Sequence, residues 1–194
     1  MSLTWWANPV ALTIAGLAAA VFLGCQAKIL HMARGIPAWR VARMPVMIVA
    51  SGLLEGLGLL AITQGGAFSD RARLVVAIVA LVLIALNAWL WRAYVSSAKL
   101  EGIGPLPRKV LERATVPLHI VGHALPAINL LVVLVAPATA GALLPLAGLA
   151  AIAGGAFWKF TVIVRASYQQ GFALSKMPKR GSGTRAAPAR LDGV

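Results

Sequence analysis

The 194-residue chain has little charge and almost no cysteine. Only 12% of its residues are charged, against roughly a quarter in ordinary globular proteins. Its single cysteine, Cys25, excludes an internal disulfide, a cysteine-ligated iron–sulfur cluster and a cysteine zinc site. The sequence also has no phosphate-binding glycine loop and no nucleophile–base arrangement. We therefore expect neither catalytic residues nor metal ligands in this chain.

Apolar residues, in contrast, make up 60% of the sequence. A chain of this size cannot enclose so much apolar surface in one water-facing core, so lipid must be the solvent for much of it. The net charge of +13 does not indicate a nucleic-acid partner, because the basic residues lie between the apolar runs and near the C-terminus. No basic stripe interleaved with aromatic residues is present. The composition predicts an integral membrane protein in contact with the lipid bilayer.

Five apolar runs are each about 20 residues long, the length that a helix needs to cross a bilayer. They cover residues 9–30, 45–64, 74–94, 116–135 and 140–164. The expected fold is all-α: a polytopic transmembrane helix bundle over residues 1–175, followed by a basic, flexible cytoplasmic tail over residues 176–194. Six tryptophans near the ends of the runs are typical of interfacial anchors. They are Trp5, Trp6, Trp39, Trp89, Trp91 and Trp158.

The basic residues predict how the spans are oriented. All but two of the 18 Lys and Arg residues end or follow the first, third or fifth run. The exceptions, Arg71 and Arg73, lie beside Asp70. The positive-inside rule therefore places the N-terminus outside and the C-terminus in the cytoplasm.

Two of the connections carry local signals. Residues 35–40 predict a turn with an amphipathic tip at the cytoplasmic interface. Residues 102–107 hold two glycines and two prolines, which predicts that a helix ends there before a short amphipathic stretch over residues 108–114.

Glu55 is the only carboxylate within a predicted span. Ionisable groups in the membrane mark function by default, so Glu55 suggests a protonatable group near a quinone or on a proton path. The alternative is a neutral, hydrogen-bonded Glu that holds two helices together. Gly52 and Gly56 lie four residues apart, the small-xxx-small pattern that admits another helix. Lys159 is the deepest of the basic residues near helix ends, where it either snorkels or reaches inward.

His119 and His123 are four residues apart, so they share one face of a helix. They could donate a hydrogen bond to a quinone carbonyl or to a neighbouring helix. Pro117 and Pro126 flank the pair and free backbone carbonyls that could accept from it. One of the two could instead ligate a haem together with His31, from opposite sides of the ring.

Four segments of the chain carry a family resemblance: residues 26–40, 51–58, 117–126 and 157–174. They resemble the membrane-anchor subunits of complex iron–sulfur molybdoenzymes, the polysulfide reductase and dimethyl sulfoxide reductase anchor family, including phenylacetyl-CoA:acceptor oxidoreductase forms. The first and last segments are the more specific, because they combine aromatic, basic and glycine positions. The match looks like the C-terminal part of such a subunit, since family members commonly have more spans than this chain.

The resemblance implies a shortened subunit that holds an iron–sulfur electron-transfer subunit and a molybdenum- or tungsten-pterin catalytic subunit at the inner (cytoplasmic) membrane. Such a subunit is non-catalytic or quinone-reactive, and it exchanges electrons with a quinone without haem. Glu55, His119 and His123 would then serve the quinone or its protons. The iron–sulfur partner would dock on basic loops that also attract anionic lipid. The expected docking residues are Arg34, Trp39, Arg40, Arg43, Arg108 and Lys109.

Two other functions compete with this interpretation. The first is a cytochrome anchor that carries haem b, with His31 and either His119 or His123 as ligands. The second is a small multispan transporter. Transporters often show internal repeats, and this sequence shows none at a fixed period.

Overall fold

The structure, a computed structural model, describes residues 8–33, 35–168, 176–177 and 187–188. Its helices are α1 (Pro9–Met32), α2 (Met44–Gln64), α3 (Asp70–Ser97), α4 (Pro105–Leu118), α5 (Leu125–Val135), α6 (Ala140–Phe160) and α7 (Ala166–Tyr168). Two π-helical segments, His119–Ala124 and Thr161–Arg165, join α4 to α5 and α6 to α7. Short 3₁₀ turns lie at Pro37–Trp39, Gly65–Ala67 and Pro137–Thr139.

The expected tail over residues 176–194 falls mostly outside the described residues, as do Trp5 and Trp6. Two pieces of the tail are described. They are β1 (Lys176–Met177) and β2 (Ala187–Pro188), which pair in an antiparallel register.

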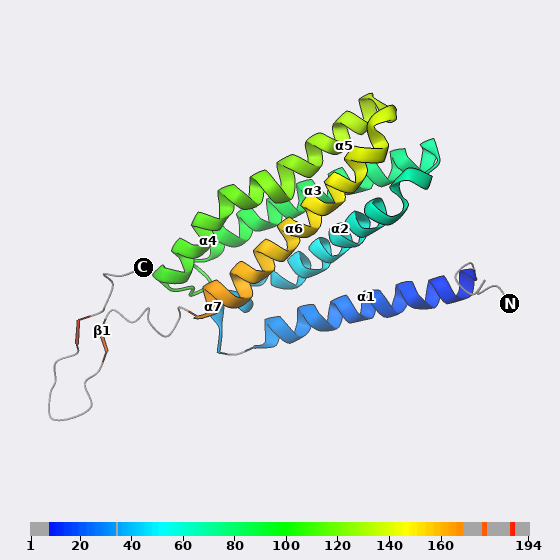
Figure 1. Ribbon diagram of the computed structural model, residues 1–194. Helices are drawn as coiled ribbons and strands as arrows, with labels where there is room; N and C mark the ends of the chain where they lie inside the picture. Colours follow the sequence, from blue (N-terminus) through cyan, green and yellow to red (C-terminus); the bar gives the residue numbers. More distant parts are fainter. Residues whose placement is uncertain (1–7, 34, 169–175, 178–186, 189–194) are drawn as a thin grey trace.

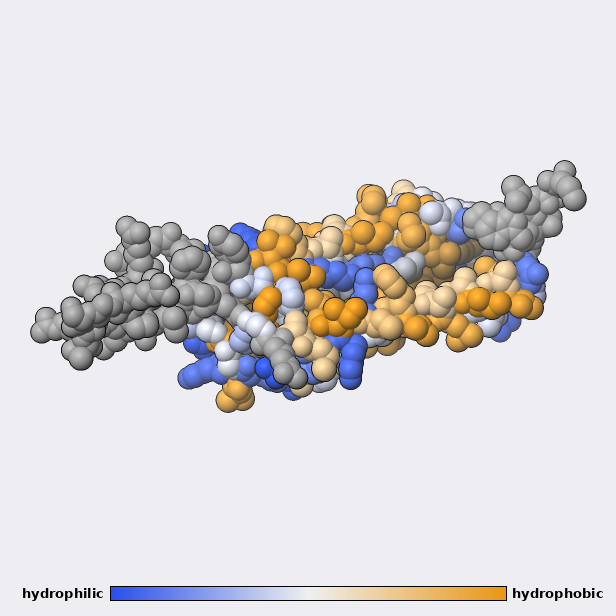
Figure 2. Space-filling model, turned by 90° about the horizontal axis from the view of Figure 1, so that it is seen from below, coloured by the Kyte–Doolittle hydropathy of each residue, from blue (hydrophilic) through white to orange (hydrophobic). Residues whose placement is uncertain are grey.

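Five helical rods within the described residues are long and apolar enough to cross a membrane, which confirms the predicted all-α bundle. They span Pro9–Met32, Met44–Ala67, Asp70–Ser97, Pro105–Val135 and Pro137–Arg165. The rods run alternately up and down, so the loops after α1 and α3 and helix α7 gather at one end of the bundle (Figure 1). Hydrophobic residues cover most of the face shown in Figure 2, with hydrophilic residues toward the ends and in a strip between them.

The predicted helix ends need two corrections. Helix α3 begins at Asp70, before the apolar run, because the Ser69 side chain caps it by accepting a hydrogen bond from the Ala72 backbone N–H at 3.3 Å. The amphipathic stretch expected over residues 108–114 is helical but begins earlier, as part of α4. The chain turns at Gly102, whose φ of +79° suits glycine, and α4 begins at Pro105. A proline costs nothing in the first helical turn, where its missing N–H has no partner to lose.

Glycines let α6 approach two helices at once. Gly148 of α6 lies against the backbone of Gly58 in α2, and Gly154 of α6 lies against Gly122 in the π-helical segment. Only one glycine of the predicted Gly52/Gly56 pattern contacts another helix. Leu23 of α1 packs over Gly52, whereas nothing lies near Gly56. Spacing therefore identified a helix face that accepts a neighbour, but not the closest contacts of the bundle.

We expect Gly148→Ala to lower the free energy of unfolding by about 2 kcal/mol, a typical cost of overpacking. The added methyl group would overlap the Gly58 carbonyl oxygen, which is backbone and cannot move without separating α2 from α6. Unfolding of the detergent-solubilised chain by added SDS measures the change. Gly141→Ala is the matched control on α6, because the space around Gly141 is open; equal losses for both variants would contradict this account of the contact.

Helix α1 stands apart from the other rods. It packs against α2 and the Pro37–Trp39 turn, and Ala27 is its only buried residue. Its first half diverges from the bundle (Figure 1). Helix α6 packs against both α2 and α5, and α3 packs against the same two helices from another side.

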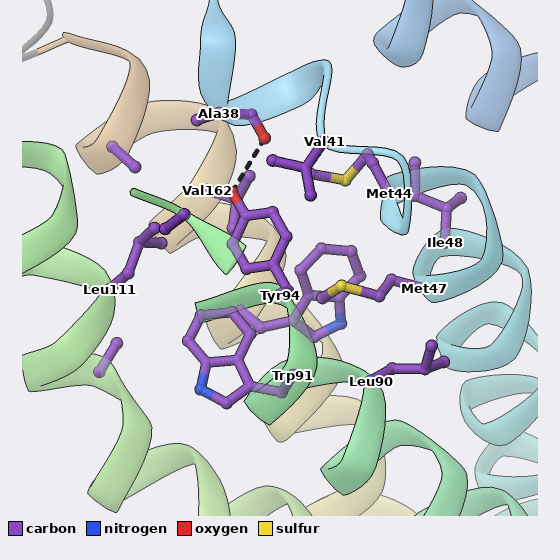
Figure 3. Packing of buried hydrophobic residues seen from close by; sticks show 14 of the residues in the cluster. Ala38, Val41, Met44, Met47, Ile48, Leu90, Trp91, Tyr94, Leu111 and Val162 are labelled. Atoms are coloured by element: carbon purple, nitrogen blue, oxygen red, sulfur yellow. Dashed lines mark hydrogen bonds between the residues drawn. The ribbon is translucent and has the colours of Figure 1, made fainter. Parts of the chain in front are cut away.

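The turn over residues 35–40 is anchored to the protein core by its middle, while Gly35 and Arg40 are exposed. Its expected place at the membrane interface stays a prediction. Ala38 and Val41 are fully buried, and the Tyr94 hydroxyl of α3 donates to the Ala38 carbonyl oxygen at 2.9 Å (Figure 3). The turn is held from α6 as well, because the Trp39 indole N–H donates to the carbonyl oxygen of Val162 at 3.2 Å. These contacts hold the turn to α3 and to the π-helical segment that follows α6.

Two of the expected interfacial anchors, Trp91 and Trp158, are core residues. Trp91 is only 1% exposed and its indole N–H donates to the Thr115 hydroxyl of α4 at 3.0 Å. Trp158 of α6 is also buried and belongs to the same cluster of buried residues as Trp91. Trp89, in contrast, is exposed as expected. Position near a helix end does not tell which way a tryptophan faces, and an indole whose N–H finds a partner packs well inside.

We expect Tyr94→Phe to lower the free energy of unfolding by about 1–2 kcal/mol, because the buried Ala38 carbonyl would lose its side-chain donor. The same SDS titration measures the loss. An unchanged midpoint would show that the hydroxyl does not hold the turn.

Candidate functional site

An ion pair joins α2 to α6 inside the bundle. The Lys159 Nζ atom lies 2.7 Å from both carboxylate oxygens of Glu55. The Lys159 and Glu55 side chains are 31% and 24% exposed, respectively. The structure therefore pairs the only carboxylate expected within a span with the lysine that sequence analysis placed deepest.

The ion pair lies well within the membrane-spanning part of the rods. At a rise of about 1.5 Å per residue, Glu55 is roughly 16 Å from the start of α2 at Met44, and Lys159 is roughly 9 Å from Arg165. Gly155, one turn before Lys159 on the same face of α6, makes room for the carboxylate: a methyl group there would overlap Glu55 Oε1. Such a pair is costly to desolvate, which favours a functional role for it.

Lys159 also lines a pocket. This pocket has a volume of about 350 Å³ and lies between α1, the Pro37–Trp39 turn, the start of α2 and the end of α6. We call it the headgroup pocket. Its polar and aromatic lining residues are Gln26, Trp39, Trp158 and Lys159, and its aliphatic lining residues are Ile29, Leu30, Met44, Ile48, Val162 and Ile163. Ile29 and Ile163 are exposed, so the pocket is accessible from the side of the bundle that faces lipid.

A second, smaller cavity lies inside the bundle. Its volume is about 20 Å³, and Ser51, Asn87 and His123 are its polar lining residues. Trp158 and Gly155 also line it, so Trp158 borders both spaces. Asn87 makes an interhelical hydrogen bond: its side-chain nitrogen donates to the Ala50 carbonyl oxygen of α2 at 3.2 Å.

His119 and His123 are neighbours, as predicted, with ring centroids 5.1 Å apart. Neither lines the headgroup pocket. Within the described residues, both His119 nitrogens and the Nδ1 atom of His123 are buried without a hydrogen-bond partner. The carbonyls freed by Pro117 and Pro126 are therefore not partners of these three nitrogens. The chain continues here through a π-helical segment, in which the Leu125 N–H donates to the Ile120 carbonyl. The described residues bring no third His, Cys, Asp or Glu to the pair as a metal-binding group.

The structure does not bring His31 to the histidine pair. His31 lies at the end of α1, which packs against α2 and the Pro37–Trp39 turn. The pair lies on the α4–α5 rod, which packs against α3 and α6, on the other side of the bundle from α1 (Figure 1).

The expected docking residues gather at one end of the bundle, except Arg34, which lies outside the described residues. Arg40 and Lys109 are exposed, whereas Arg43 and Arg108 are half-buried. Trp39 is half-buried and already donates to Val162. Among the expected docking residues that the structure describes, Arg40 and Lys109 are thus the exposed cations.

Sequence analysis missed the part that Gln26 and Trp158 play in the headgroup pocket. Trp158 was interpreted as an interfacial anchor. The π-helical segment Thr161–Arg165 follows Trp158 directly, and such segments often occur at functional sites. Apolar sequence gives no local signal for them.

No family model, curated protein or solved structure matches this chain. The resemblance to molybdoenzyme anchor subunits rests on the four sequence segments alone and stays a prediction.

Proposed function

We propose that this chain is a membrane anchor and quinone-reactive subunit of a molybdenum- or tungsten-pterin iron–sulfur oxidoreductase. It passes electrons between a partner iron–sulfur subunit and the quinone pool. The observation that carries the proposal is the Glu55–Lys159 ion pair, whose ammonium group also lines a pocket of about 350 Å³.

The headgroup pocket suits the chemistry of a quinone. Ligand pockets commonly measure about 300–1,000 Å³ and combine an apolar lining with a few placed polar groups. A quinone ring is flat and apolar and has an acceptor oxygen at each end. Trp39 and Trp158 supply aromatic surface, while Lys159 and Gln26 supply donors from different helices.

Quinone reduction also consumes two protons, and the ion pair supports a route for them. Lys159 donates to a carbonyl oxygen of the quinone, and Glu55, bonded to the same ammonium group, exchanges protons with it. His119 and His123 do not line the pocket, so this proposal replaces them with Lys159 and Gln26 as donors to the quinone.

The charge distribution supports a docking role for the end that carries Arg40 and Lys109. Basic residues of the described chain concentrate there, while Arg71 and Arg73 lie at the opposite end beside Asp70. In the proposed orientation this end faces the cytoplasm of a bacterial-type inner membrane, where an iron–sulfur subunit can bring its cluster close to the headgroup pocket.

Gentle detergent purification of the tagged chain from its native membrane tests the proposal. Mass spectrometry of the eluted complex should identify an iron–sulfur subunit and a pterin-containing subunit, and solvent extraction should release a quinone. The chain eluting alone, or with stoichiometric haem, would overturn it.

A further inference from the structure

The small cavity between α2, α3, α6 and the His119–Ala124 segment has the dimensions of a water site. Its volume is about 20 Å³, and roughly 10–15 Å³ is enough to hold one water molecule. Three of its lining residues, Ser51, Asn87 and His123, are polar. A cavity that is both roomy enough and polar binds water, whereas a purely apolar cavity of this size stays dry.

His123 needs a partner that the described residues do not supply. The residue is 9% exposed, and its Nδ1 atom is buried without a hydrogen bond to any described group. Leaving a buried polar atom unpaired costs about 1–3 kcal/mol. A ligand in the adjoining cavity removes that cost.

The other two polar residues present acceptors. The Asn87 side-chain nitrogen donates to the carbonyl oxygens of Ala50 and Leu83, at 3.2 and 2.8 Å. Both its hydrogens are therefore used, and its amide oxygen remains an acceptor. The Ser51 hydroxyl donates to the Ile48 carbonyl oxygen at 3.1 Å, which leaves its lone pairs to accept.

We infer that this cavity binds a single water molecule. The water donates one hydrogen to the Asn87 amide oxygen and the other to the Ser51 hydroxyl oxygen, and it accepts a hydrogen bond from the Nδ1–H group of His123. Three partners is the usual number for a buried water.

The site also lies beside the ion pair. Gly155 lines the cavity and contacts the Glu55 carboxylate. The water site does not depend on the proposed function, because it is argued only from the cavity and its three polar lining residues.

Solid-state NMR of the full chain in lipid vesicles tests the water site, with ¹⁵N-labelled histidine and magnetisation transferred from water. His123→Gln identifies the His123 signals by their absence. In the wild type we expect the Nδ1 signal of His123 to receive magnetisation from an immobilised water. Ser51→Val fills the cavity and removes an acceptor, so the signal should remain while the transfer is lost.

Thr63→Val is the matched control, because the Thr63 hydroxyl donates to its own helix, as that of Ser51 does, but lies outside the cavity. It should leave the transfer unchanged. No transfer in the wild type, or equal transfer in Ser51→Val, would overturn the inference. The wild-type result is decisive by itself if Ser51→Val does not fold. Vesicles without quinone are used, so a failure of the proposed function does not alter the outcome.

Discussion

Lys159→Met is expected to lower the free energy of unfolding by about 3 kcal/mol, the cost of removing one partner of a buried ion pair. The change leaves the Glu55 carboxylate without its ammonium partner, roughly 16 Å from the start of α2. The Glu55→Leu change is expected to cost less, because Lys159 is nearer to the end of its rod and its long side chain can reach water there. SDS titration of the detergent-solubilised variants measures both.

The double variant Glu55→Leu/Lys159→Met separates pairing from packing. Replacing both charges by apolar groups of similar size removes the desolvation cost together with the attraction. The double variant should therefore be closer to the wild type than Lys159→Met is. If the two single losses simply add, the residues are not coupled and the ion pair does not join α2 to α6.

Ile29→Trp is expected to weaken quinone binding about tenfold or more, which corresponds to about 1.4 kcal/mol. Ile29 lies on the rim of the headgroup pocket and is 70% exposed. A larger ring at this position occupies the entrance without disturbing the core. Binding of ubiquinone-1 and of a short-chain menaquinone to the purified chain, measured by quenching of tryptophan fluorescence, gives the affinities.

Phe22→Trp is the control for this change. Phe22 is also an exposed residue of α1, and it does not line the headgroup pocket. The Phe22→Trp change adds a tryptophan to the same helix and should leave the affinity for quinone unchanged. Equal affinities for the wild type and Ile29→Trp would show that the quinone does not enter between α1 and the bundle.

Sequence analysis identified the five spans because a helix in lipid needs a long apolar run, and length and composition detect such runs directly. The predicted helix ends were less accurate where a side-chain cap or a proline determines the residue at which the helix begins. Ser69 extends α3 by one turn before the apolar run. The break predicted by the Gly- and Pro-rich stretch is present, but the next helix begins within that stretch, at Pro105, rather than at Arg108.

Which side chains point into the bundle and which point toward lipid was harder to predict than the spans. In lipid, apolar residues suit both sides of a helix, so Trp91 and Trp158 could not be distinguished from interfacial anchors. The glycine pairs Gly58–Gly148 and Gly122–Gly154 depend on which helices meet, and spacing within one helix does not contain that information.

The candidate site was predicted in part. Glu55 stood out because a carboxylate within an apolar span is rare, and the inward reach of Lys159 was one of two alternatives. Gln26, Ile29 and Trp158 come together only because the end of α1 lies beside the start of α2 and the end of α6. A pocket between segments so distant in the sequence has no signature in any one of them.

Electron transfer from a partner's iron–sulfur cluster to added quinone tests the central claim most directly. The complex purified through this chain would be reduced with dithionite, mixed with ubiquinone-1 or a short-chain menaquinone, and frozen at intervals for EPR of the reduced cluster. We expect the cluster signal to disappear with at least one of the quinones, and about tenfold more slowly in the complex that carries Ile29→Trp at subsaturating quinone. A cluster that stays reduced in excess of both quinones, or a rate that Ile29→Trp leaves unchanged, would contradict the assignment of this chain as the quinone-reactive subunit.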